Sequence, residues 1–95
     1  MKTIFDLLMD FEEFYIKDDP RTSILRSSHQ KIIYSYAREK TTITLEEFKF
    51  MYAEPIAVLR CFMQLKFLGF LKSEDNITFQ FIPYEKPFDD DKREK

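Results

Sequence analysis

The stretch PIAVLRCFMQLKFLGFLK, residues 55–72, constrains the fold of this chain more than any other segment. At about 100° per residue, its spacing predicts a helix that ends near Gly69 and runs into a strand. The apolar side chains of this helix fall on two opposed faces. One face comprises Val58, Cys61, Phe62, Leu65 and Leu68, and the other comprises Ile56, Leu59, Met63 and Phe67. A chain this short offers one core, so the second face needs another cover.

Composition indicates one small domain without a phosphate loop. The 95 residues include 11 Phe and are 44% hydrophobic, which suffices for an independent core and excludes disorder throughout. Gly69 is the single glycine, so glycine-rich phosphate and dinucleotide loops are excluded. Cys61, the single cysteine, has no partner for an internal disulfide and is expected to be a small buried residue. The net charge of −2 lacks the basic footprint of a nucleic-acid-binding chain.

The N-terminal residues MKTIFDLLMDFEEF carry acidic side chains where a signal peptide needs an unbroken apolar run. No segment reaches the roughly 18 consecutive apolar residues of a membrane span. The sequence therefore predicts a soluble, cytoplasmic protein with no membrane partner.

Residues 1–19 are predicted to form an N-terminal amphipathic helix, over positions 2–17, with a broad apolar arc. The arc comprises Ile4, Phe5, Leu7, Leu8, Phe11, Phe14 and Tyr15, extended by Met9 and Ile16. An ordinary surface helix needs an apolar stripe little wider than about 100°, so this arc is wide enough to touch two surfaces. Its polar stripe is acidic, which disfavours binding to anionic lipid.

A second helix is predicted from Pro20 to about Lys40, with Asp19 as its N-cap. Its expected buried residues are Ile24, Leu25, Ile32, Ile33, Tyr36 and Ala37, and its expected outward line is Ser27, Lys31, Tyr34 and Arg38. A short strand at 41–44 and a helix over 45–52, capped by Thr44, are expected next. After the helix at 55–68, strands at 70–72 and 77–82 flank a turn at 73–76. Residues 83–95 are expected to form a flexible charged tail.

The order of these elements over residues 22–82 resembles the winged-helix superfamily. The residues that carry the resemblance are TITLEEF at 42–48, Pro55, Val58, Leu65, LGFL at 68–71 and SEDNITFQFI at 73–82. The resemblance names no individual family. It implies an α+β, mainly α fold: a winged helix of three helices plus a small β-wing over 20–82, with an extra N-terminal amphipathic helix and a disordered charged C-terminal tail.

Winged-helix proteins most often place the outward face of the recognition helix in the DNA major groove. The resemblance puts Ile56, Leu59, Arg60, Met63, Gln64 and Phe67 at these outward positions. Only Arg60 and Gln64 have the donors that base edges or phosphates require, and the wing tip carries Glu74 and Asp75. These side chains depart from the DNA-reading pattern and favour a protein interface.

Leaving four large apolar side chains in water forgoes about 1.5–3 kcal/mol each, and exposed patches of this kind normally mark interaction surfaces. Three covers are open for them. The first helix of the same chain folds over the stripe, a second copy of the chain covers it in a dimer, or a different protein binds it.

The remaining polar candidates carry weaker signals. Arg21, Arg26, Lys31 and Arg38 form a basic line that suits a nucleic acid or an acidic partner, or that balances an otherwise acidic protein. The run at 27–29, Ser-Ser-His, points in different directions along a helix, so no nucleophile–base pair is expected. The acidic run at 89–91 lacks the fixed geometry that a divalent cation prefers. No catalytic residue, cofactor, metal or small-molecule substrate is predicted.

The sequence thus predicts a non-enzymatic winged-helix protein that acts through protein–protein contacts, as an adaptor, accessory subunit or inhibitor, in some nucleic-acid-handling complex by fold analogy. The alternative is a dimeric DNA-binding transcriptional regulator. In that version the first helix makes the dimer, and Arg60, Gln64 and the basic second helix touch DNA.

Overall fold

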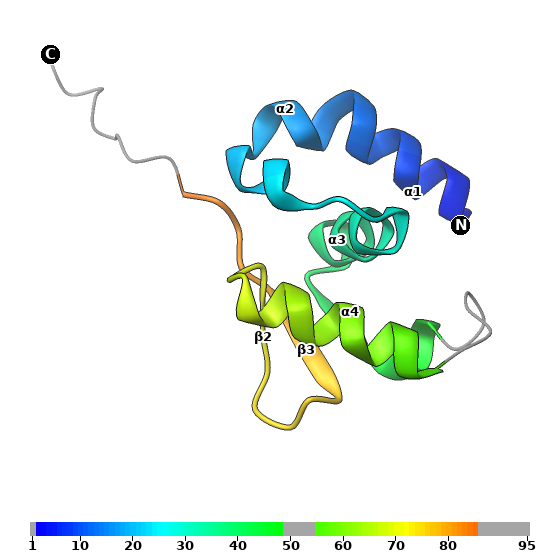
Figure 1. The fold of residues 1–95 in the computed structure, drawn as a ribbon, viewed down its shortest axis with the longest axis vertical. Coiled ribbons are helices and arrows are strands. Elements are labelled where there is room, and N and C mark those ends of the chain that lie inside the picture. Colours follow the sequence, from blue (N-terminus) through cyan, green and yellow to red (C-terminus); the bar gives the residue numbers. More distant parts are fainter. Residues whose placement is uncertain (1, 49–54, 86–95) are drawn as a thin grey trace, which may run out of the picture.

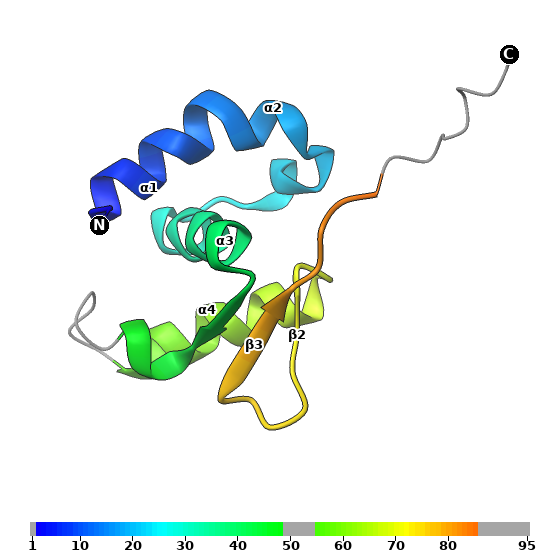
Figure 2. The ribbon, with the colours of Figure 1, turned by 180° about the vertical axis from the view of Figure 1, so that it is seen from behind.

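The computed structural model describes residues 2–48 and 55–85. It is a mostly helical α+β structure with one three-stranded antiparallel sheet. The central helix is α3 (Ser28–Lys40). The N-terminal helix lies on one side of α3, and α4 (Pro55–Phe67) lies on the other side together with the sheet (Figures 1 and 2). None of the helices over residues 2–48 and 55–85 has the length and hydropathy that a membrane span requires.

The N-terminal helix is continuous but changes its winding. α1 (Ile4–Asp10) leads into a π-helical turn, η1 (Phe11–Tyr15), which leads into α2 (Ile16–Asp18). The side chain of Thr3 accepts from the backbone of Asp6, whose carboxylate accepts from the backbone of Thr3. This reciprocal capping box fixes the start of the helix.

The π turn decides which aromatic side chains of the N-terminal helix face the protein. The backbone N–H of Ile16 donates to the carbonyl of Phe11, one residue further back than in an α-helix. The extra residue rotates the positions that follow. Tyr15 consequently stays on the inner face with Phe11, and both contact the Tyr34 ring. Phe14 would share that face in a regular α-helix, but it is 59% exposed.

The predicted single helix from Pro20 to Lys40 is wrong in its first half. Pro20–Ile24 form a short 3₁₀ helix, η2, and the chain leaves helical geometry at Leu25. α3 then starts with a second capping box, in which Ser27 accepts from the backbone of Gln30 and the Gln30 side chain accepts from the backbone of Ser27. The break also corrects the expectation for Ile24, which is 48% exposed rather than buried.

The predicted start of that helix is partly confirmed. Asp19 is the N-cap of η2, where its carboxylate accepts a 3.0 Å hydrogen bond from the backbone N–H of Arg21, and Pro20 is the first helical residue. An N-cap acceptor followed by proline thus marks a helix start, but not the length of the helix.

The region between α3 and α4 follows the predicted order of a strand and then a helical turn, although the Thr44 hydroxyl donates to Glu47 and is not seen to accept as a helix cap. β1 (Thr42–Thr44) occupies most of the predicted strand, and η3 (Leu45–Phe48) is a 3₁₀ turn where a helix over 45–52 is predicted. The Glu47 carboxylate accepts from the backbone N–H of Thr44 at 2.9 Å. The rest of that predicted helix lies outside the described residues.

α4 ends as predicted. Gly69 has a φ of +94°, the left-handed conformation that glycine adopts most readily. Its N–H donates to the carbonyl of Lys66, and the N–H of Phe70 donates to the carbonyl of Leu65. These two hydrogen bonds define a Schellman motif, which terminates the helix and turns the chain into β2 (Leu71–Lys72).

The sheet has the strand order β1-β3-β2, with β3 (Thr78–Phe81) in the centre. Ile43 pairs with Phe79 across β1 and β3, and Leu71 pairs with Phe81 across β2 and β3. The β2–β3 turn is held by Asp75, whose Oδ1 accepts from the backbone N–H groups of Ile77 and Thr78, both at 2.9 Å. The two predicted strands at 70–82 therefore form the expected hairpin.

The core is centred on Tyr34, which contradicts its predicted outward position. Tyr34 is fully buried and meets four aromatic rings edge-on: Phe11, Tyr15, Phe70 and Phe81. The sequence reading gave α3 one buried face, whereas the N-terminal helix covers its second face. Phe11 belongs to the main core, so the N-terminal helix and the segment from residue 20 onward share one interior.

Candidate protein-interaction surface

The outward face of α4 is apolar and exposed. We call Ile56, Leu59, Met63 and Phe67 the outer stripe; their exposed fractions are 72%, 40%, 37% and 89%. On the opposite face of the same helix, Val58, Cys61, Phe62 and Leu65 are buried in the core, as predicted. Leu68, predicted to join them, is instead 39% exposed. Helical periodicity thus separates the two faces correctly up to the last turn.

The N-terminal helix does not provide the missing cover. It packs on α3, and α3 separates it from α4 in both views (Figures 1 and 2). The sequence leaves three possible covers for the outer stripe: the chain's own first helix, a second copy or a different protein. The structure does not adopt the first of these. The large exposed fractions of Ile56 and Phe67 show the same directly.

A shallow hollow of about 430 Å³ lies beside the C-terminal half of the outer stripe. It is lined by Gln30, Arg60, Met63, Gln64, Phe67 and Leu68. The amide Nε2 of Gln30 donates to Oε1 of Gln64 at 2.9 Å, which ties the start of α3 to α4 at the edge of the hollow. Sequence reasoning missed Gln30 and Leu68 here; the Ser27–Gln30 spacing was the available signal, because a capping box fixes where α3 begins.

The other edge of the stripe is tied to the hairpin. Lys66 Nζ donates to the side-chain oxygen of Asn76 in the β2–β3 turn, at 2.8 Å. Asn76 has a φ of +59°, so the turn presents this side chain from a left-handed residue. One residue on each side of the outer stripe, Gln64 and Lys66, is therefore hydrogen-bonded to a neighbouring element.

The charges of α4 are all positive. Arg60 and Lys66 are its only ionisable side chains besides Cys61, and its sequence contains no carboxylate. Burial raises the pKa of the Cys61 thiol, so Cys61 is neutral at pH 7. Arg60 is exposed beside the stripe, at one of the outward positions predicted for it. The surface thus combines an apolar centre with a polar, cationic margin, which is typical of protein interfaces.

Two members of the predicted basic line serve to hold the N-terminal helix. Lys31 Nζ pairs with Glu12 at 3.1 Å and lies over the ring of Phe11. Arg38 pairs with Asp18 and stacks over the ring of Tyr15, 4.3 Å from its centroid. Arg26 is exposed at the start of α3. Arg21 pairs with Asp19, so three of the four members of the predicted basic line make ion pairs within the described residues.

Asp19 anchors a buried polar cluster where η2 meets α3. Its carboxylate accepts from Nη2 of Arg21 and from the Tyr34 hydroxyl, both at 2.7 Å, and the Tyr34 oxygen accepts from Arg38 at 3.0 Å. Burial alone would raise the pKa of Asp19, but the hydrogen bonds from Arg21 and Tyr34 outweigh it and lower that pKa below its ordinary value. Burial and the bond to Asp19 raise the pKa of Tyr34.

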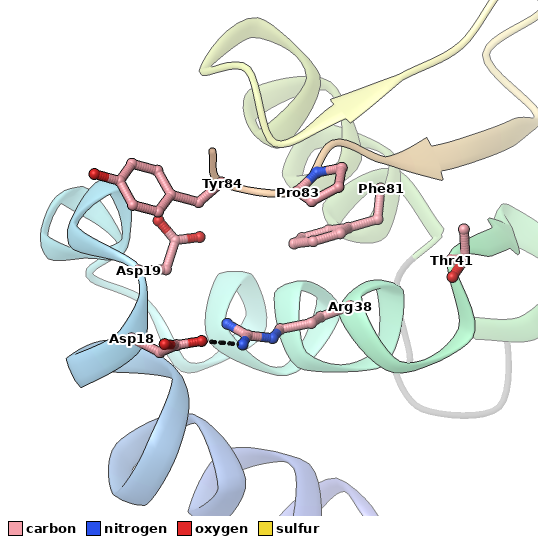
Figure 3. Close-up of a pocket in the computed structure, with 7 residues that line it drawn as sticks. All are labelled: Asp18, Asp19, Arg38, Thr41, Phe81, Pro83 and Tyr84. Atoms are coloured by element: carbon pink, nitrogen blue, oxygen red, sulfur yellow. Dashed lines mark hydrogen bonds and ion pairs between the residues drawn. The ribbon is translucent and has the colours of Figure 1, made fainter. Parts of the chain in front are cut away.

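A pocket of about 320 Å³ opens beside this cluster (Figure 3). Asp18, Asp19, Arg38 and Thr41 line one side, and Phe81, Pro83 and Tyr84 line the other. Its carboxylates already pair with Arg38 and Arg21, so the arrangement explains how the N-terminal helix joins the core rather than how a ligand would bind. Among the described residues, no group of His, Cys, Asp and Glu could hold a metal ion.

Comparisons with protein-family models, with curated proteins and with solved structures found no match for this chain.

Proposed function

We propose that this chain is a non-enzymatic winged-helix protein that docks onto another protein through the outer stripe of α4. One observation carries the proposal: a helix whose inner face is buried also presents Ile56, Leu59, Met63 and Phe67 to solvent. Leaving that much apolar surface in water is unfavourable, whereas burying it against a partner recovers about 25 cal/mol for each Å². Polar contacts with Arg60 and Gln64, at the margin of the stripe, would fix the orientation of the partner.

The winged-helix part of the proposal is supported by the order and pairing of the elements. A helix, β1, a 3₁₀ turn, α4 and a two-stranded hairpin follow one another, and β1 joins the hairpin beside β3. In that fold α4 takes the place of the recognition helix, and the β2–β3 hairpin takes the place of the wing. The outward surface of α4 is then the surface that winged-helix proteins most often place in the DNA major groove.

The side chains on this surface favour a protein partner over DNA. Large apolar groups form its centre, and Arg60 is the cation at its outward positions. The alternative, a dimeric DNA-binding regulator, also needs cations on the second helix, where Lys31 and Arg38 already pair with Glu12 and Asp18. A DNA reader needs several donors free to reach phosphates and bases.

The test uses a photo-reactive residue in the cell that expresses the chain. p-Benzoylphenylalanine replaces Phe67, which is 89% exposed, and in a matched control it replaces Ile24, which is 48% exposed outside the stripe. We expect protein cross-links from position 67 that are absent from position 24 and that Met63→Ser abolishes.

A titration against mixed-sequence duplex DNA completes the test. We expect no measurable binding at low salt. Equal cross-linking from positions 67 and 24 would overturn the proposal. So would a DNA affinity that falls steeply with salt, because counterion release on phosphate contact produces that dependence.

A further inference from the structure

The N-terminal helix carries a second exposed apolar face. Phe5, Met9 and Phe14 are 73%, 56% and 59% exposed, and we call them the N-terminal stripe. Phe5 and Met9 are one α-helical turn apart, and the π turn lengthens the next turn so that Phe14 follows Met9 on the same side. The inner face of the same helix, with Leu7 and Phe11, is buried. This helix therefore has two apolar faces, and no described part of the chain covers one of them.

The two stripes match in size. Phe5 to Phe14 spans about 14 Å along a helix axis, and Ile56 to Phe67 spans about 16 Å at 1.5 Å per residue. Each stripe presents large side chains over about three turns, which is the length over which two helices pack side by side.

The two stripes also differ in charge. The N-terminal helix carries Lys17 and five carboxylates: Asp6, Asp10, Glu12, Glu13 and Asp18. Asp10, Glu12 and Asp18 already pair with Lys2, Lys31 and Arg38 of the same chain, whereas Asp6 and Glu13 are exposed and in none of these ion pairs. α4 carries Arg60 and Lys66 and no carboxylate. An acidic apolar helix and a basic apolar helix attract each other, whereas two copies of either one meet with like charges opposed.

The stripes cannot meet within one molecule, because α3 separates the two helices (Figures 1 and 2). We propose that the outer stripe of α4 receives the N-terminal stripe of a second copy of this chain. The inference rests on the proposed function, since it names the occupant of the same docking surface. The contact joins different surfaces on the two copies, so a bound pair still offers one free outer stripe on one copy and one free N-terminal stripe on the other. Association through this contact therefore continues beyond the dimer as the concentration rises, into rings or into longer chains.

Two double variants test this. Met9→Ser with Phe14→Ser removes the N-terminal stripe, and Met63→Ser with Phe67→Ser removes the outer stripe. Sedimentation velocity should show concentration-dependent assembly of the wild-type chain and a monomer for each variant alone. An equimolar mixture of the two variants should form a 1:1 dimer and nothing larger, because it contains one intact stripe of each kind.

Controls separate loss of contact from loss of fold. Ile24→Ser changes an exposed apolar residue outside both stripes and should leave wild-type assembly unchanged. If either double variant loses its helical circular dichroism, Phe5→Ser and Ile56→Ser replace it, because these side chains are 73% and 72% exposed.

Each other outcome overturns the inference. A mixture that stays monomeric shows that the stripes do not pair, and assembly of one variant by itself shows that a stripe pairs with its own copy. Loss of this inference leaves the docking function standing if position 67 still cross-links to a different protein. The docking function fails separately, when position 67 captures no protein at all.

Discussion

The hydroxyl of Tyr34 donates a 2.7 Å hydrogen bond to the carboxylate of Asp19, and both residues are almost fully buried. Asp19 precedes the short η2 helix, and Tyr34 lies in the middle of α3. The bond therefore joins the end of the N-terminal helix to the core. Arg21 supplies the opposite charge, with its guanidinium 4.8 Å from the centroid of the Phe70 ring.

Tyr34→Phe should lower the free energy of unfolding by about 1–3 kcal/mol, because it removes one hydrogen bond from the buried Asp19 carboxylate and leaves one donor of Arg38 without its partner. Urea unfolding at pH 7 measures the change. Tyr15→Phe is the matched control: Tyr15 bonds Glu39 near solvent, at 2.9 Å, and should cost at most about 1 kcal/mol. Equal losses of unfolding free energy in the two variants would show that the Asp19–Tyr34 bond stabilises the fold no more than a bond near solvent does.

The Asp19 cluster also sets a pH dependence. The pKa of Asp19 is lowered in the folded protein, so the folded state binds fewer protons than the unfolded chain near pH 4. The stability that Asp19 contributes is present above its ordinary pKa of about 3.9 and is lost as the pH falls through its lowered pKa. Asp19→Asn should flatten the decline of unfolding free energy below pH 4. An unchanged decline in this variant would assign the acid sensitivity to other carboxylates.

Ser35 differs from the Asp19 cluster, because its buried hydroxyl has no hydrogen-bond partner in the described residues. Its side chain is completely buried in α3, and its hydroxyl is the one buried side-chain polar atom in the described residues that lacks a hydrogen-bond partner. Ser35→Ala removes that polar atom and improves helix propensity, so we expect about 1 kcal/mol of added stability. Ser28→Ala, in the exposed first turn of the same helix, should change stability by less than about 0.5 kcal/mol. A loss of stability on Ser35→Ala would mean that the hydroxyl is bonded in solution.

The elements that the sequence predicts best are those whose ends carry a capping or turn residue. Gly69 stops α4, and the turn around Asp75 separates two strands, because these residues satisfy local backbone groups whatever lies further away. Local chemistry does not say which apolar surfaces meet. Lys31 and Arg38 look like an outward line on α3, yet their stems and charges lie against Phe11 and Tyr15 of the N-terminal helix.

The residues of the candidate site can be predicted because the helical periodicity of α4 is local. Whether another part of the chain covers them cannot be predicted, because that depends on packing between distant segments. Periodicity alone places Leu59, Met63 and Phe67 on one face of α4, and that face is exposed. It does not show that the N-terminal helix lies elsewhere, because either apolar surface would accept that helix. Nor does it show Phe14 outside, because a π turn leaves no periodic signal in a single sequence.

The two faces of α4 should respond differently to substitution. Phe67→Ser should change the free energy of unfolding by less than about 0.5 kcal/mol and raise solubility, because the side chain is 89% exposed. Leu65→Ala, two residues earlier and fully buried, should cost about 2–5 kcal/mol. Urea unfolding of both variants at one dilute protein concentration measures this. A large loss from Phe67→Ser would show that the outer stripe belongs to the core.

The π turn yields the sharpest prediction about the N-terminal helix. A π turn is an α-helix with one residue inserted, so deleting Glu13 should restore regular α-helical winding. Tyr15 then falls three positions after Phe11 instead of four, and it keeps its place against Tyr34. Phe14 stays outside. The deletion should therefore cost no more than about 1 kcal/mol, because no buried contact is lost.

Deletion of Gln30 from the regular helix α3 is the contrasting case, and it also removes the capping side chain of α3 and its bond to Gln64. It rotates Ile33, Tyr34 and Ala37 relative to the cap at Ser27 by about 100°, away from the core or the N-terminal helix. That chain should fail to fold, as judged by circular dichroism. If deletion of Glu13 abolishes folding as well, the extra residue is required for the helix to pack on α3, and the orientation of Phe14 follows from that packing rather than from an insertion that the fold can lose.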